Sequence, residues 1–205
     1  MPTAKVHRIS AAAPDDVRGI EDAIIGGRID PDGIVAIFGK TEGNGCVNDF
    51  TRGYATQSLG LMLHRFVPRE RAAEVCLVMS GGTEGGMAPH WVVFERCEDS
   101  KGERPALALG QSHTAALPPK HLGRLGQVDQ VAAGVRSAMA AANIESVSDV
   151  HFVQIKCPLL TAQRIAEADN RSSVAVRDTL KSMGLSRAAR RSASQLRSMR
   201  SSARV

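Results

Sequence analysis

The sequence predicts an α+β fold built of βαβ-type repeat units, with one complete unit and a partial second unit. Short apolar runs typical of strands alternate along the chain with segments of helical periodicity. Two of the strand-like runs also end alike, at Lys40 and at Lys156, and each is followed by a loop and then an arginine, Arg52 and Arg187. The two lysines are 116 residues apart and the two arginines 135 apart, a spacing typical of a domain-sized repeat.

The expected elements follow from the pattern of apolar residues. GIVAIFGK at 33–40 is apolar on both alternating faces, as in a strand that is buried on both sides. The segment at 125–144 instead places its apolar residues at helical spacing along one stripe. Strands are expected at 4–10, 33–40, 74–80, 90–95, 104–114 and 149–156. Helices are expected at 14–28, 48–66, 125–144 and 160–169.

These elements divide the chain into a first repeat unit at 1–115, a partial second unit at 116–187 and a basic tail at 188–205. From Ser186 onward the chain contains six arginines and no acidic residue, and the rest of the chain holds 20 basic against 21 acidic residues. The net charge of +5 is therefore a property of the tail. An Arg/Ser-rich tail is typical of a disordered segment or an interaction arm. The folded part gives no reason to expect a nucleic-acid partner.

The remaining composition favours a cytoplasmic protein without a membrane partner. The first residues contain no apolar signal region, and no stretch approaches 18 apolar residues. The four cysteines form no C-x-x-C pair, so neither a zinc pattern nor a disulfide framework is expected. An apolar content of 43% is sufficient for a hydrophobic core.

The glycine cluster SGGTEGG at 80–86 follows an apolar run and fits none of the common glycine motifs. It lacks the lysine of a P-loop, it does not open a helix as a dinucleotide fingerprint does, and Val78 stands where a nucleophile elbow has glycine. Two interpretations remain open. The cluster is either a plain turn or a small anion or carbonyl site, because glycine lets a ligand approach the main chain.

Lys40 and Ser80, both at strand ends, also allow two interpretations. The lysine caps a solvated edge and the serine starts a turn, or the two form a pair in which a neutral lysine takes the serine's proton. In the second case a nearby arginine would hold an electron-rich substrate through paired N–H bonds. The spacing alone does not decide between them.

Four stretches together resemble the cyanuric acid hydrolase and barbiturase family of ring-opening amidohydrolases. They are SGGTEGG at 80–86, FGKTEGNGCVNDFTRGYA at 38–55, VQIKCPLLT at 153–161 and RDTLKSMGLSR at 177–187. The resemblance implies three similar units around a threefold-like axis, each supplying one lysine, one arginine and one serine to a central site. The reaction it implies is hydrolytic opening of a cyclic imide, most closely that of cyanuric acid to carboxybiuret.

The resemblance also assigns roles to residues. Lys40, Arg52 and Ser80 would form the first set, with the Gly81 N–H beside Ser80. Lys156 and Arg187 would begin the second set. The catalytic residues implied are Lys156, Ser80 and Lys40, and the substrate-binding residues are Arg52, Ser80, Gly81 and Arg187. No cofactor and no metal ligand are implied among these residues, and full-length members are expected to be homo-oligomers.

The chain departs from the family pattern after Arg187. With the 135-residue spacing, the counterpart of Ser80 would fall at about position 215, beyond the last residue. We therefore expect a C-terminally truncated member that is inactive as given. Barbiturase activity is one alternative, and a non-catalytic fragment with an anion-binding basic tail is another.

Overall fold

The computed structural model describes residues 3–82, 86–97, 107–168 and 174–189. The chain divides into two compact units, Met1–Gln111 and Ser112–Val205.

The first unit contains a four-stranded mixed sheet with the strand order β1-β4-β2-β3. The strands are β1 (Thr3–Ser10), β2 (Ile34–Lys40), β3 (Cys76–Ser80) and β4 (His90–Cys97). β4 is antiparallel to both β1 and β2, whereas β2 and β3 are parallel. The helices α2 (Thr51–Leu63) and α3 (Arg69–Glu74) connect β2 to β3. This is a βαβ unit, and the predicted α+β class is confirmed.

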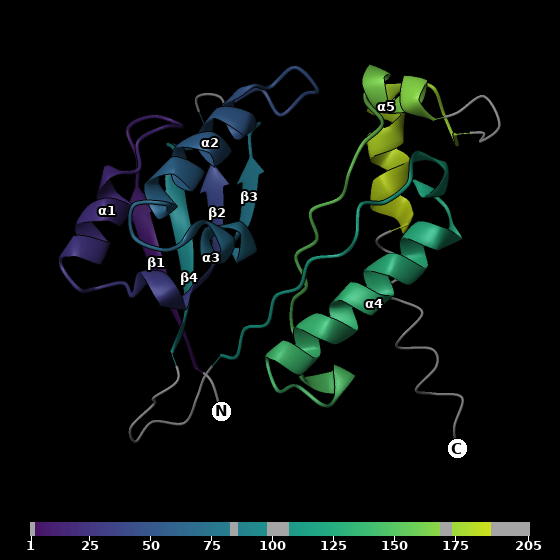
Figure 1. The fold of residues 1–205 in the computed structure, drawn as a ribbon. Coiled ribbons are helices and arrows are strands. Elements are labelled where there is room, and N and C mark those ends of the chain that lie inside the picture. The colour runs from purple at the N-terminus through teal and green to yellow at the C-terminus, as the bar shows by residue number, and fades with distance from the viewer. Residues whose placement is uncertain (1–2, 83–85, 98–106, 169–173, 190–205) are drawn as a thin grey trace. The chain divides into compact units, whose positions relative to one another are not determined.

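The hydrophobic core lies between the helices and one face of this sheet (Figure 1). Ile37 of β2, together with Trp91 and Val93 of β4, is fully buried on that face. The helix α1 (Arg18–Ile25) contributes Ile20 to the same core. Apolar residues at alternate strand positions, packed against helical stripes, account for this two-layer arrangement.

The other face of the sheet carries the alternate residues and ends in polar groups. Phe38 of β2 packs there against Phe94 of β4, with ring centroids 4.7 Å apart. Lys40 and Ser80 are the last residues of β2 and β3 and are opposite each other in the register. Because these two strands are parallel, their carboxyl ends meet at one edge of the sheet.

In the described residues of the second unit, the regular secondary structure is all helical. It contains α4 (Leu125–Ala141), α5 (Ala162–Glu167) and a further helix at 179–189. Gln127 and Ser186 are buried, and the Gln127 amide donates to the Ser186 hydroxyl at 2.8 Å. This bond joins the first turn of α4 to the 179–189 helix. Short 3₁₀ turns lie at Pro31–Gly33 in the first unit and at Pro119–His121 and Val147–Asp149 in the second.

Two predicted strands are wrong. Residues 149–156 form no strand, and the described part of 104–114, from 107 onward, has no regular secondary structure. A strand requires a neighbour that takes its backbone hydrogen bonds, and an apolar pattern does not supply one. The Ala4 N–H of β1 donates to the Leu107 carbonyl at 3.1 Å, and this single bond does not make 107–114 a strand.

The first two residues of the predicted tail are helical, contrary to the prediction. Ala188 and Ala189 continue the 179–189 helix, and Ala189 is buried against Val128 of α4. Alanine is the best helix former, so the helix extends into the Arg/Ser-rich sequence. The predicted disorder at 190–205 lies outside the described residues.

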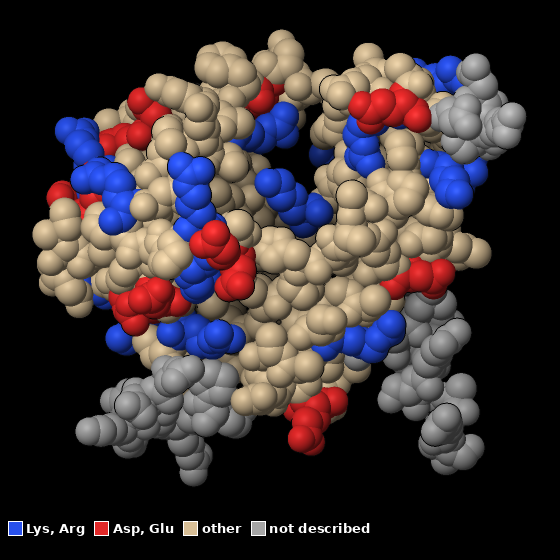
Figure 2. Space-filling model, in the orientation of Figure 1, with Lys and Arg blue, Asp and Glu red and all other residues tan. Residues whose placement is uncertain are grey.

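The surface of the described residues mixes both signs of charge. Figure 2 shows Lys and Arg side chains interspersed with Asp and Glu across the face in view. This agrees with the near-balance of charges that the sequence gives outside the tail. Of the helices in the described part of the chain, none is both long and apolar enough to span a membrane.

Candidate functional site

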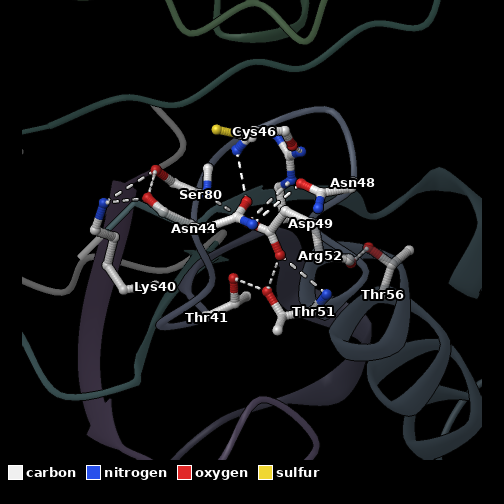
Figure 3. Close-up of polar contacts among 12 residues, drawn as sticks. Lys40, Thr41, Asn44, Cys46, Asn48, Asp49, Thr51, Arg52, Thr56 and Ser80 are labelled. Atoms are coloured by element: carbon white, nitrogen blue, oxygen red, sulfur yellow. Dashed lines mark hydrogen bonds and ion pairs between the residues drawn. The ribbon is translucent and has the colours of Figure 1, made fainter. Parts of the chain in front are cut away.

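The centre of the candidate site is a contact between Lys40 and Ser80 at the ends of β2 and β3 (Figure 3). Lys40 Nζ donates to Ser80 Oγ at 3.0 Å and to the Gly81 carbonyl at 3.4 Å. The Thr41 N–H donates to the Ser80 carbonyl at 3.0 Å, which continues the β2–β3 pairing one residue beyond the strands. The parallel register therefore fixes the two side chains at hydrogen-bonding distance.

The glycines of SGGTEGG allow two loops to approach each other closely. A Cβ atom on Gly81 would overlap with Asp49 Oδ2. Gly45 adopts φ of 71°, and a Cβ atom there would lie 3.0 Å from the Gly82 Cα. Gly81 and Gly82 thus form a close-packed corner against the loop at 43–49, where the Asp49 side chain leaves no room for a side chain at Gly81.

Arg52 is the second residue of α2 and is anchored by that same loop. Its Nη2 donates to the Cys46 carbonyl at 2.5 Å, and its Nε lies 3.6 Å from Asp49 Oδ2. The side chain is 29% exposed. These contacts use only part of the five N–H donors of a guanidinium, so the group can also donate to a ligand.

Asp49 was missed by the sequence reasoning and lies at the centre of this arrangement. Its side chain is fully buried. Burial alone would raise the pKa of this carboxyl. Hydrogen bonds from the Thr51 hydroxyl and from the N–H groups of Gly45 and Thr51, followed by the charge of Arg52, outweigh burial and lower the pKa of the carboxyl. Asp49 stands two residues before Thr51, the first residue of α2, and an aspartate near a helix start is a typical capping residue.

The structure brings together one of the two predicted sets of residues. Figure 3 shows Lys40, Ser80, Asp49 and Arg52 gathered around the loop that carries Cys46. The chain segments that hold them, residues 40–52 and 80–81, all belong to the first unit. Gly81 belongs to this set through its carbonyl, which accepts from Lys40, and the donor role expected of its N–H stays a prediction.

The other two predicted residues lie in the second unit. Lys156 is exposed, in a segment without regular secondary structure, and Arg187 is exposed on the 179–189 helix. Neither is carried by a strand end or by the first turn of a helix, as Lys40 and Arg52 are. The local geometry of the first set is therefore not repeated around them.

A metal centre finds no support in the residues that the structure describes. They include no group of three or more His, Cys, Asp or Glu side chains placed to hold a metal ion. Cys46, in the loop at 43–49, is exposed, and its backbone carbonyl accepts from Arg52. What the site offers are hydrogen-bond donors, suited to carbonyl or anionic oxygens.

Most of this chain can be aligned with the sequences of known proteins. Residues 5–193 match the family model described as amidohydrolase ring-opening protein. A cyanuric acid amidohydrolase of Azorhizobium caulinodans is 63% identical over 191 residues, which are 92% of this chain and 53% of that protein. One from a Bradyrhizobium species is 56% identical over 199 residues, 92% of this chain and 54% of that protein.

Solved structures agree with the sequence comparisons. The crystal structure of the cyanuric acid hydrolase from A. caulinodans matches with a TM-score of 0.85 at 62% identity, over 93% of this chain and 53% of that one. A second cyanuric acid hydrolase, described as an innovation by structural concatenation, also has a TM-score of 0.85, at 46% identity. The chain spans about half the length of the curated relatives it matches. With a family match over nearly its whole length, the chain belongs to the ring-opening amidohydrolase family.

Proposed function

We propose that the corner formed by Lys40, Ser80, Gly81 and Arg52 binds the carbonyl edge of a cyclic imide, and that this ring is cyanuric acid. The side-chain donors support the proposal, because the lysine, serine and arginine groups gathered here suit carbonyl oxygens. The identity of the ring rests on relatives, which are cyanuric acid amidohydrolases at up to 63% identity. Barbituric acid presents similar carbonyls and is the alternative ligand.

The proposed reaction is a serine–lysine hydrolysis of the ring. A lysine Nζ takes the proton of a serine Oγ, the Oγ attacks a ring carbonyl carbon, and backbone N–H groups hold the oxyanion. The ring C–N bond then breaks, the departing nitrogen takes a proton, and water hydrolyses the ester to give carboxybiuret. We assign the base of this step to Lys156 and a substrate-holding role to Arg187, both of the second unit.

The contacts of Lys40 favour a binding role for the first pair. Lys40 Nζ lies within hydrogen-bonding distance of two acceptors, Ser80 Oγ and the Gly81 carbonyl. A carbonyl oxygen can only accept, so Lys40 Nζ acts as a donor towards Gly81, which suits a binding role. With Lys40 donating to Ser80 Oγ, the serine's own proton is left with a long 3.4 Å contact to the Gly81 carbonyl, which a carbonyl of a bound ring can replace. The contact of Lys40 with Ser80 is the observation that carries the proposal.

The test is calorimetric titration of the 205-residue chain with cyanuric acid. We expect saturable binding, and Ser80→Ala should weaken it about tenfold, because one hydrogen bond to a carbonyl is lost. Ser58→Ala is the matched control, since the Ser58 hydroxyl donates to the Tyr54 carbonyl within α2. Failure of the wild-type chain to bind, or equal effects of the two variants, would contradict the proposal. Tighter binding of barbituric acid would select the alternative ring.

A second assay addresses turnover by this polypeptide alone. We expect no release of carboxybiuret or, in a coupled assay, of ammonia, because the chain spans about half of each relative and the family reaction draws donors from three units. Turnover that Ser80→Ala abolishes would contradict this expectation. In that case Ser80 would be the nucleophile.

A further inference from the structure

The carboxylate of Asp49 contacts each chain segment that builds the candidate site. Oδ2 accepts the Gly45 N–H at 2.9 Å and lies 3.6 Å from Arg52 Nε. Oδ1 accepts the Thr51 N–H at 3.0 Å and also the Thr51 hydroxyl. Gly81 packs directly against Oδ2, because a Cβ atom there would overlap with it. One buried carboxylate therefore contacts the loop at 43–49, the first turn of α2 and Gly81, the residue after Ser80.

The two oxygens of this carboxylate have separable roles. Oδ1 serves the helix, because it accepts from the first residue of α2, where the N-cap Phe50 provides no side-chain bond. Oδ2 contributes nothing to the helix end. Oδ2 faces the Gly45 N–H in the loop at 43–49, the backbone of Gly81 next to Ser80, and the guanidinium of Arg52.

From this geometry we propose that Asp49 is the positioning residue of the site. Its Oδ2 sets the Arg52 guanidinium and the Gly81 backbone in one arrangement, so that both face a ligand held by Lys40 and Ser80. Arg52 is additionally held from the other side by the Cys46 carbonyl, so Oδ2 and this carbonyl together fix the plane of the guanidinium. The inference rests on the proposed binding of a ring at this corner.

The principal variant is Asp49→Asn in the full 205-residue chain. It preserves the size of the side chain and one acceptor for Thr51, and it replaces Oδ2 with an amide that donates towards Gly45 and Arg52. Thr51→Val is the matched control, since it removes a bond to the same carboxylate on the Oδ1 side and leaves the Oδ2 side intact. We expect both variants to lose thermal stability.

The variants are distinguished by the Arg52 Nε–H resonance of the ¹⁵N-labelled chain, which needs no ligand. We expect Asp49→Asn to shift this resonance or to remove it through faster exchange with water, whereas Thr51→Val should leave its chemical shift unchanged. Cyanuric acid titration gives the second readout: Asp49→Asn weakens binding about tenfold or more, and Thr51→Val changes it less than twofold. If Asp49 had only a structural role, both variants would change the Arg52 resonance and the binding of cyanuric acid to a similar extent.

A double-variant cycle separates positioning from stability. Asp49→Asn should weaken cyanuric acid binding strongly in the wild-type chain and have little further effect in an Arg52→Gln background, because its action passes through Arg52. Additive losses would overturn the inference. So would an unchanged Arg52 Nε–H signal in Asp49→Asn.

Two remaining outcomes are also decisive. If the wild-type chain does not bind cyanuric acid, the proposed function fails, and the Arg52 resonance alone decides the role of Asp49. If Asp49→Asn does not fold, the wild-type chain is titrated with acid instead. The Arg52 signal must then follow the protonation of Asp49, with a midpoint below the usual value of 3.8, and a signal that stays unchanged until unfolding overturns the inference.

Discussion

Two segments that end in lysine, 33–40 and 149–156, have similar apolar patterns and different structures. The first is a paired strand between β3 and β4, and its Ile37 is fully buried. The second forms no strand, and Val153, which occupies the matching position before its lysine, is 38% exposed. The apolar residues alone therefore do not determine which segment becomes a strand.

The difference shows how the candidate site is made. Lys40 meets Ser80 because β2 and β3 are parallel neighbours, and the pairing places the two residues opposite each other. The site is thus a product of strand pairing between segments 40 residues apart. Lys156 ends a segment without such a pairing in the described part of the chain, and its surroundings differ accordingly.

This comparison predicts that the largest difference in stability will appear when the two matching side chains, Ile37 and Val153, are each replaced by alanine. Ile37→Ala should cost about 3 kcal/mol, because it leaves a cavity in a fully buried site, whereas Val153→Ala should cost about 0.5 kcal/mol or less. Urea unfolding followed by the fluorescence of Trp91, the one tryptophan, measures the first variant. Far-UV circular dichroism measures the second. A loss from Val153→Ala as large as that from Ile37→Ala would show that 149–156 is a packed strand in solution.

A somewhat smaller effect is expected from Gly39→Ala, one residue before Lys40. A Cβ atom there would lie 2.5 Å from a Trp91 ring carbon and 2.6 Å from the Met79 sulfur. The ring is fully buried and cannot move away freely, so we expect a loss of about 2 kcal/mol. Unfolding followed by Trp91 fluorescence measures it. Unchanged stability would mean that β2 and β4 tolerate a wider spacing than the structure shows.

Much of the first unit could be predicted from the sequence, because its elements have strong local signals. β2 and β4 have continuous apolar runs, and α1 ends at two glycines. The short helix α3 could not be predicted in this way, since RERAAE carries one buried residue, Ala72, and no apolar stripe. The sequence pattern predicts an apolar face of α2 that contains Tyr54, Leu61 and Leu63, and this is wrong for Tyr54 and Leu61, which are exposed.

The candidate site, too, could be predicted from the sequence only in part. Lys40, Ser80 and Arg52 could be named from motifs, but their contact depends on strand order, which the sequence pattern does not contain. Asp49 could not be distinguished from an ordinary helix cap, because its second oxygen acts on residues up to 32 positions away in the sequence, at Gly81. Tertiary contacts, rather than local propensity, give this residue its role.

Acid should weaken the first unit through Asp16. A hydrogen bond from the Arg18 side chain, followed by one from the Ala12 N–H, lowers the pKa of Asp16 from 3.8 to about 2. The unfolded chain therefore binds the proton first, and the stability that Asp16 provides is present above pH 3.8 and lost as the pH falls towards 2. The Trp91 Nε1–H donates to the Asp16 carbonyl at 2.7 Å, so tryptophan fluorescence reports this loop. Asp16→Asn should flatten the pH dependence over that interval, by less than the Gly39 effect, and an unchanged slope would contradict the assignment.

The smallest effect expected is a gain, from alanine in place of one helical glycine in each unit. Gly60 of α2 and Gly184 of the 179–189 helix both lie in helix interiors, and a Cβ atom at either position meets nothing within 4 Å. Alanine loses less backbone entropy on folding than glycine, so each substitution should stabilise its helix by about 0.5–1 kcal/mol. Thermal unfolding followed by Trp91 fluorescence should report Gly60→Ala, and the helical signal at 222 nm should report Gly184→Ala. A loss of stability from Gly184→Ala would mean that the 179–189 helix is not formed in solution, and the buried contact between Gln127 and Ser186 would then be absent as well.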